Sequence, residues 1–301
     1  RKAPYSPSVP AASYNDLRRP FPMHDPRVPE TLEGWSVLHQ MFRIRWPEWR
    51  VRPEDLRRRL AGEAAEAIEA MRRRQAGTTV PVTLLGHKGD LMLVHLRRSF
   101  EELQAAQVSV ARLGLATFLE PTTSFVSIVE LGMYEMTAQI HKRLGERGLV
   151  TGSAEFEGAF DAEMEEQRKR VSGRLWAEVP ARRHVCFYPM NKRRGEVKNW
   201  YAEPVEARAR MMLDHGKIGR HYAGEVSQII SGAIGFDDWE WGVDLFADDP
   251  VVFKKLIYEM RFDEASAWYA EFGPFYVGLQ FSPSELPGYL EGAVPALRPV
   301  P

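Results

Sequence analysis

The segment Val80–Leu96 reads VPVTLLGHKGDLMLVHL, and the prediction of the fold starts from it. Two of its runs, Val80–Leu85 and Leu91–Leu96, are rich in apolar and β-branched residues, as strands are. Between them, Gly86–Asp90 supplies the glycines and the aspartate that favour a tight turn. The segment is therefore predicted to form a β-hairpin.

The residues on either side of this hairpin extend the pattern. Phe100–Ala111 is predicted as a helix with Ser99 as its N-cap, and Ser124–Leu131 supplies a strand. Upstream, apolar residues alternate from Trp35 as in a strand, and Pro53–Gln75 has the Ala-, Glu-, Leu- and Arg-rich composition of a helix. The order strand, helix, strand, strand, helix, strand is the ferredoxin-like arrangement.

The same order recurs in the second half of the chain. The elements predicted there, again strand, helix, strand, strand, helix and strand, are Val185–Met190, Glu203–Tyr222, Val226–Ser231, Glu240–Phe246, Val251–Glu264 and Phe275–Phe281. Two copies of one unit predict the α+β class, with tandem ferredoxin-like domains that form a protomer of the dimeric α+β barrel type.

Proline, glycine and glutamate content suggests the domain boundaries. We expect an extended proline-rich arm at 1–30 that could lie against a neighbouring subunit, and an N-terminal ferredoxin-like domain at 31–150. A linker is expected at 151–180, a C-terminal ferredoxin-like domain at 181–283, and a proline-rich surface tail at 284–301.

The composition is that of an ordinary globular protein, with 301 residues and 44% hydrophobic side chains to form a core. No apolar run is long enough to cross a bilayer, and the first 29 residues do not resemble a signal peptide, so a cytoplasmic location is expected. A single cysteine, Cys186, excludes internal disulfides and cysteine-based metal sites. With 40 basic and 41 acidic residues, nothing indicates nucleic-acid binding.

Two groups of residues in the second half have unusual patterns. His215 falls on the apolar stripe of a predicted helix, where a histidine is either a core residue or a metal ligand. Tyr188, Met190 and Lys192 stand two apart on one predicted strand and so share a face, which is either a pocket wall or an ordinary strand surface. The residues alone leave both questions open.

Longer runs carry a resemblance to a known family. In the second half these runs are YPMNKRR at 188–194, NWY at 199–201, MMLDHG at 211–216, IGFDD at 234–238 and YEMRFDE at 258–264. PETLEGW at 29–35 and LGHKGDLM at 85–92 are the runs in the first half. With these motifs the chain resembles the coproheme decarboxylases of the chlorite dismutase-like family; Asn191 departs from the pattern, because a small hydroxyl residue is expected there.

The resemblance implies a role for each candidate site residue. It implies that His215 is the axial ligand of a porphyrin iron and that Tyr188 is the redox-active residue, forming a tyrosyl radical. Lys192 and Arg174 match propionate-binding positions, where Ser266 adds a hydroxyl donor, and Met190 belongs to the pocket wall. Lys192 is expected to be catalytic together with Tyr188.

Gln228 matches the position above the iron. Chlorite dismutases carry an arginine there, which can hold a charged oxyanion, whereas a neutral amide is no acid–base catalyst near neutral pH. Gln228 therefore argues against chlorite turnover.

The implied activity is the peroxide-dependent decarboxylation of two propionates of iron-coproporphyrin III (coproheme) to vinyl groups, which gives haem b. Coproheme would be substrate and cofactor, bound by the C-terminal domain. Expected partners are hydrogen peroxide, a coproporphyrin ferrochelatase in transient contact, and further copies in a homopentamer, with no nucleic acid and no membrane span. Two alternatives stay open: a non-catalytic haem carrier or sensor, and a chlorite dismutase or peroxidase on the same fold.

Overall fold

The computed structural model describes residues 24–25, 27–72 and 77–296. Most of the expected N-terminal arm and the last five residues of the expected tail lie outside these ranges. Within them, no helix combines the length and apolar character needed to cross a bilayer.

Nine strands of the described residues form one sheet. They are β1 (Thr31–Ile44), β2 (Gly77–Leu84), β3 (Leu91–Arg97), β4 (Leu119–Gly132), β5 (His184–Lys192), β6 (Val226–Gly232), β7 (Trp241–Ala247), β8 (Ala270–Phe272) and β9 (Tyr276–Gln280). Their order is β7-β6-β4-β1-β3-β2-β9-β5-β8, and β5 also pairs with β7. This last pairing closes the sheet into a barrel, and β8 pairs with Met190–Lys192 of β5, beyond the residues of β5 that pair with β9.

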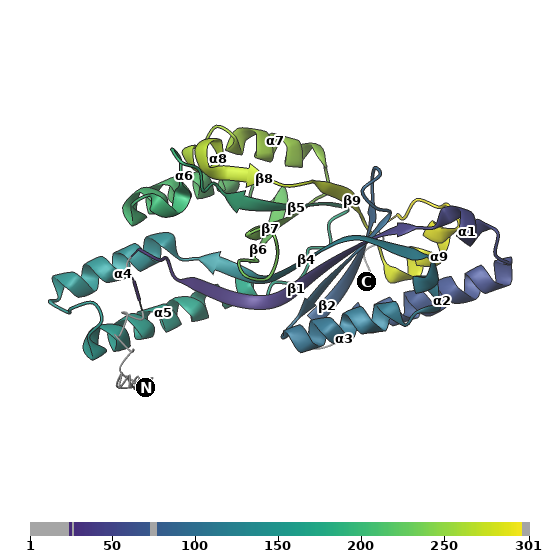
Figure 1. The fold of residues 1–301 in the computed structure, drawn as a ribbon, viewed down its shortest axis with the longest axis horizontal. Coiled ribbons are helices and arrows are strands. Elements are labelled where there is room, and N and C mark those ends of the chain that lie inside the picture. Colours follow the sequence, from purple (N-terminus) through teal and green to yellow (C-terminus); the bar gives the residue numbers. More distant parts are fainter. Residues whose placement is uncertain (1–23, 26, 73–76, 297–301) are drawn as a thin grey trace, which may run out of the picture.

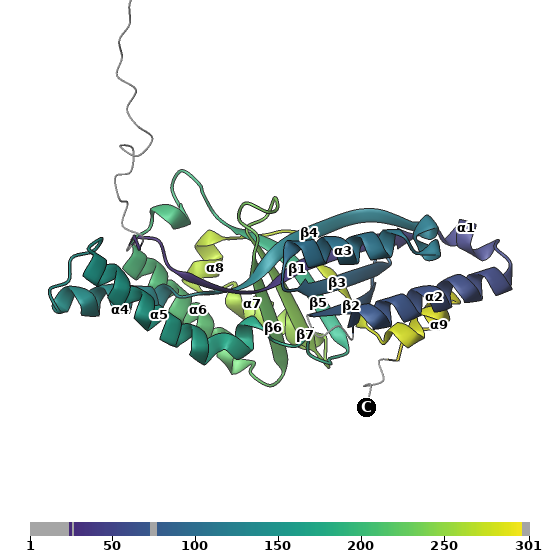
Figure 2. The same ribbon diagram turned by 90° about the horizontal axis from the view of Figure 1, so that it is seen from below.

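Helices lie on the outside of the barrel (Figures 1 and 2). They are α1 (Trp46–Arg50), α2 (Glu54–Arg72), α3 (Phe100–Ala111), α4 (Tyr134–Glu146), α5 (Ala154–Leu175), α6 (Val205–His221), α7 (Val251–Met260), α8 (Glu264–Tyr269) and α9 (Leu286–Leu290). The strand order β4-β1-β3-β2 in the first half matches β9-β5-β7-β6 in the second. The predicted tandem ferredoxin-like fold of the α+β class is therefore confirmed.

Two seams join the halves. At one seam Ile128 and Val129 of β4 pair with Gly232 and Ser231 of β6, and at the other β2 pairs with β9 through Val82↔Gln280, Thr83↔Leu279 and Leu84↔Gly278. The barrel interior is filled from both halves by Val37, Met41, Val82, Met92, Phe125, Val185, Phe187, Ile229 and Phe246. The two halves consequently share one core.

A buried polar pair crosses this core. His39 of β1 places Nε2 3.0 Å from Oδ1 of Asp244 on β7, and both side chains are buried. The ring of His39 also stacks on Phe187 of β5 at 4.0 Å between centroids. Strands from the two halves are thus connected inside the barrel by hydrogen bonding as well as by apolar packing.

Several elements differ from the sequence predictions. The segment expected as a linker contains the 22-residue helix α5, whose Phe156 and Phe160 pack on α4, a helix that the sequence analysis did not predict. Leu286 and Leu290 of α9 are buried against α2 in the core of the first half, so this part of the expected surface tail is not a surface segment. The helix predicted at 251–264 ends at Met260, and a separate helix, α8, begins at Glu264.

Candidate functional site

Strand β5 separates the barrel interior from the candidate site. Val185 and Phe187 point into the barrel, whereas Cys186 and Tyr188 belong to an apolar cluster on the outer face, against which Met190 also packs. This alternation is the two-residue period of a strand. Helix α7 packs over β7, and its Phe253 and Leu256 belong to the same outer-face cluster as Tyr188.

Tyr188 is a buried phenol in an aromatic environment. Its ring stacks on Phe275 at 4.6 Å between centroids and lies 5.7 Å from Phe272. Burial raises the pKa of Tyr188 well above its usual range, so the hydroxyl keeps its proton at physiological pH. Among the described residues, none forms a hydrogen bond with this hydroxyl. Tyr188 therefore offers an O–H bond to a substrate placed beside the sheet.

Lys192 is a buried ammonium at the end of β5. Its Nζ donates to the carbonyl of Ala265 at 3.4 Å and lies 4.4 Å from the ring centroid of Trp200. Burial lowers the pKa of Lys192 to about 8, although the charges of Asp263 and Glu240 oppose the shift. Within the described ranges no carboxylate lies at ion-pair distance from Nζ, so this cation can receive the carboxylate of a ligand.

His215 of α6 is held from one side. Its Nδ1 donates to Oδ2 of Asp263 at 2.9 Å, and the hydroxyl of Ser266 lies 3.1 Å from the same oxygen. Burial would raise the pKa of Asp263, but hydrogen bonds from His215 and Ser266 outweigh it and keep that pKa below its usual value. The imidazole is 28% exposed, and Nε2 has no hydrogen-bond partner among the described residues.

The pairing of His215 with Asp263 is the arrangement that metal-binding histidines commonly show. A carboxylate that accepts from one ring nitrogen fixes the tautomer and leaves the other nitrogen as the donor to a metal. Asp263 was not predicted as a site residue, although it lies in the run at 258–264. The sequence did contain a signal for an N-cap here, because an aspartate often accepts a hydrogen bond from the backbone N–H three residues later. In the structure Asp263 caps α8 in this way, through the backbone N–H of Ser266.

The remaining predicted residues lie at different distances from this cluster. Gln228 is exposed on β6 and lies opposite Leu245 of β7, which in turn lies opposite Cys186, so Gln228 shares the outer face with Tyr188. Arg174 is exposed near the end of α5, and no described contact joins it to the other site residues.

Ser266 lies behind His215, where its hydroxyl is bonded to Asp263. The structure thus groups His215 and Ser266 around Asp263, with Lys192 in contact with the neighbouring Ala265. Tyr188 and Met190 lie on the outer face of the strand that carries Lys192, and no described contact joins Arg174 to any of these residues.

This donor set fits an iron porphyrin that carries carboxylates. The free Nε2 of His215 is a suitable axial donor, and the buried Lys192 ammonium matches a propionate. The first half has no equivalent set among its described residues, because its outer sheet face is packed with apolar residues such as Leu91 and Leu93 against α2 and α3. The candidate site therefore belongs to the second half alone.

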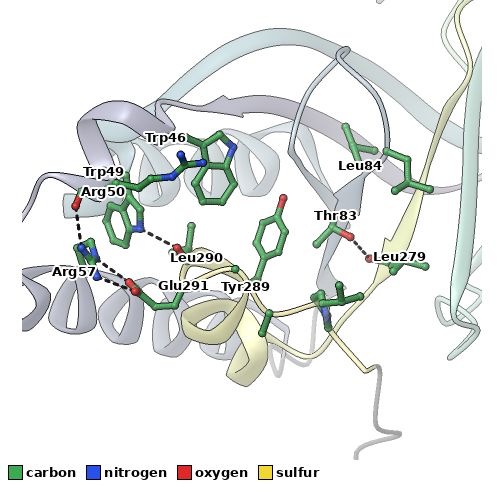
Figure 3. Close-up of a pocket in the computed structure, with 15 residues that line it drawn as sticks. Trp46, Trp49, Arg50, Arg57, Thr83, Leu84, Leu279, Tyr289, Leu290 and Glu291 are labelled. Atoms are coloured by element: carbon green, nitrogen blue, oxygen red, sulfur yellow. Dashed lines mark hydrogen bonds and ion pairs between the residues drawn. The ribbon is translucent and has the colours of Figure 1, made fainter.

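A cavity of about 460 Å³ lies elsewhere, between α1, α2, β2, β9 and α9 (Figure 3). Trp46, Thr83, Leu279 and Tyr289 line it. Arg57, at its edge, donates from Nε and Nη2 to the carboxylate of Glu291 and is not free to bind a ligand. None of the predicted site residues reaches this cavity.

Fold and site together define a tandem ferredoxin-like barrel with one histidine-based candidate site. A family profile described as chlorite dismutase matches residues 57–281, and the chain belongs to this family.

Three similar proteins extend the comparison. A coproheme decarboxylase of Staphylococcus saprophyticus is 41% identical over 84% of this chain and 94% of its own length. A solved heme-binding protein of Thermus thermophilus has a TM-score of 0.76 and 40% identity, covering 89% of this chain and 99% of that one. A Natronomonas pharaonis protein, whose name gives heme binding as provisional, is 43% identical over 86% of this chain. The chain spans only 41% of the length of this last relative.

Proposed function

We propose that this protein is a hydrogen peroxide-dependent coproheme decarboxylase. The observation that carries the proposal is the buried phenol of Tyr188 on the same strand face as the buried ammonium of Lys192, beside a histidine whose Nδ1 is held by Asp263. The similarity to the Staphylococcus saprophyticus enzyme supports it. A haem carrier would need the histidine and the ammonium but not the phenol.

The overall reaction balances with one peroxide per propionate. Each –CH2CH2COOH group and one H2O2 give –CH=CH2, CO2 and two H2O, so the propionate loses two electrons and the peroxide gains them. Two rounds convert coproheme to haem b through a porphyrin with three propionates.

Each residue of the site has a defined task. Bound coproheme supplies the iron centre at which peroxide is reduced. His215 would bind the iron through Nε2, Asp263 would hold the imidazole, and Lys192 would pair with a propionate. Tyr188 would give up the hydrogen atom of its O–H and then regain one from the β-carbon of the neighbouring propionate. Loss of CO2 and one further electron leaves the vinyl group.

Gln228 and Arg174 would have supporting roles in the reaction. Gln228 would face the iron from the outer sheet face, where its neutral amide can donate a hydrogen bond to a bound peroxide. Arg174 would have to approach from α5 to meet a propionate. We further propose that the protein works as a homopentamer in the cytoplasm and receives coproheme from a ferrochelatase, as the family resemblance implies.

The decisive variant is Tyr188→Phe, which removes the O–H and little volume. Wild-type protein with ferric coproheme and peroxide is expected to give the three-propionate porphyrin and then haem b, measured by mass analysis of the extracted porphyrins. Tyr188→Phe should bind coproheme with near-normal affinity and form neither product.

Tyr276→Phe is the matched control, because Tyr276 packs inside the barrel on Phe187. This control variant should retain the activity. Haem b formation by Tyr188→Phe at close to the wild-type rate would refute the proposed role of the phenol.

A further inference from the structure

The outward face of α7 carries a stripe of residues that has no partner among the described parts of the chain. Val251, Lys254, Lys255 and Tyr258 follow one another at the spacing of a single helix face, and Phe262 continues the line just after the helix ends. We call these five residues the α7 stripe. The opposite face of α7 is buried on the sheet through Val252, Phe253 and Leu256. Figure 1 shows α7 at the outer edge of the second half.

Three members of the α7 stripe are apolar or aromatic and yet strongly exposed. Val251 is 50% exposed, Tyr258 65% and Phe262 73%. The rings of Tyr258 and Phe262 touch each other edge to face at 5.2 Å between centroids. Clustered apolar side chains on a protein surface usually mark a site of interaction.

The other two members give the stripe a positive charge. Lys254 and Lys255 are exposed, and no carboxylate of the described residues forms an ion pair with either. The acidic groups nearby are engaged elsewhere: Asp249 accepts from the backbone N–H of Val251, Asp248 pairs with Arg182, and Glu259 accepts from the hydroxyl of Tyr222. The two ammonium groups are therefore without an ion-pair partner among the described residues and can meet an anionic surface.

We propose that the α7 stripe binds an anionic lipid surface. Lysines on a helix that also exposes aromatic residues are the features of interfacial helices, in which the rings enter the headgroup region while the ammonium groups meet anionic headgroups. The alternative occupant is an acidic protein. Anchoring residues of protein interfaces usually fill pockets in the partner and are ringed by further contacts, whereas a convex helix with isolated rings matches a deformable lipid surface better.

The α7 stripe lies next to the candidate site. Phe262 directly precedes Asp263, which holds His215, and the guanidinium of Arg261 lies 4.4 Å from the ring of Phe272 beside Tyr188. Attachment through α7 would place the His215 side of the site close to the lipid. Lipid binding itself does not depend on the proposed function. If the protein does make haem b, attachment would release the product near the lipid, which suits haem b because it has two carboxylates fewer than coproheme.

Vesicle flotation of the full chain tests the proposal. The probes are vesicles of equal parts phosphatidylglycerol and phosphatidylcholine, and vesicles of phosphatidylcholine alone. Wild-type protein should float with the first and not with the second, and added salt should weaken the binding. Lys254→Ala with Lys255→Ala should reduce the affinity about 25-fold, since each lysine near an anionic surface contributes roughly five-fold.

Matched variants distinguish binding through the α7 stripe from a general effect of the protein's positive charge. Lys142→Ala with Lys169→Ala removes the same charge from exposed positions on α4 and α5 and should leave binding unchanged. Tyr258→Ser with Phe262→Ser should abolish flotation while the lysines remain. Equal flotation by the wild type and the Lys254/Lys255 variant would overturn the proposal. Binding to soluble polyglutamate without binding to anionic vesicles would also overturn it, in favour of an acidic protein. No outcome depends on decarboxylation, so the two proposals fail separately.

Discussion

Single residues distinguish the second half of this chain from the first. The outer sheet face of the first half is apolar, whereas the equivalent region of the second half holds a buried phenol, a buried ammonium and an imidazole bonded to a carboxylate. Each of these groups is costly to bury unless a partner compensates it. Buried polar groups that lower stability are typical of functional sites, because these sites are selected for activity and not for stability.

Asp263→Asn should weaken the hold on His215 without removing the ligand. A neutral amide accepts the Nδ1–H of His215 less strongly than the carboxylate does, so less negative charge is transferred to the ring and the iron–nitrogen bond becomes weaker. The iron–histidine stretching frequency of the ferrous coproheme complex should fall, as resonance Raman spectroscopy would show. His215→Ala is the reference, because the band should vanish there. An unchanged frequency in Asp263→Asn would show that Asp263 does not influence the iron–histidine bond.

The pKa of Lys192, lowered to about 8 by burial, predicts a pH dependence of coproheme binding. An ammonium attracts a propionate and a neutral amine does not, so the affinity should be constant well below pH 8 and fall as the pH rises through 8. Between pH 7 and pH 9 the dissociation constant should increase about ten-fold. Fluorescence quenching titrations would measure it. Lys192→Met should bind more weakly and lack this part of the pH dependence.

Helices and strands show what the sequence could and could not predict. The hairpin at 80–96 and the capping of α3 by Ser99 depend on local signals, and both are present in the structure. Helix α5 has Phe156, Phe160 and Met164 at helical spacing, but its glycines and glutamates outweighed that signal in the prediction of a linker. The break between α7 and α8 places Asp263 against His215, and a contact between residues 48 positions apart could not be inferred locally.

The pairing of β2 with β9 requires a glycine at position 278. A Cβ at position 278 would lie 1.8 Å from the backbone oxygen of Thr83, so Gly278→Ala must push the two strands apart. We expect a loss of about 2–4 kcal/mol in the free energy of unfolding. Gly62→Ala is the opposite case, because that position lies inside α2 with open space around it and should gain about 0.5–1 kcal/mol. Urea titrations monitored by circular dichroism would measure both.

The whole molecule is one closed barrel, although the order of its strands and helices is repeated in the two halves. Strands of both halves pair at the seams, and the interior core draws on both. The pair of His39 and Asp244 joins β1 of the first half to β7 of the second. The sequence predicted two similar domains, but their closure into one barrel depends on pairings between distant strands that no local pattern reveals.

Asp244→Ala tests this unity. Removing one partner of a buried polar pair leaves the other unsatisfied, and we expect a loss of about 3–5 kcal/mol in the free energy of unfolding. Because the core is shared, tryptophan fluorescence and circular dichroism should report one coincident transition for the wild type and for the variant. Asp214→Ala, which removes only an exposed partner of Lys217, should cost less than about 0.5 kcal/mol. Two separate transitions in the wild type would show that the halves unfold independently.

The seam between β2 and β9 also constrains how the chain acquires its shape during synthesis. Thr83 of β2 pairs with Leu279 of β9, which follows it by 196 positions. On a ribosome the first half is complete long before its edge strand can be covered, and that edge stays open to pairing with other chains in the meantime. Ring closure must come late and be slow, because it joins segments far apart along the chain. Truncation before position 276 should therefore produce chains that associate through β2 and do not remain as separate half-barrels.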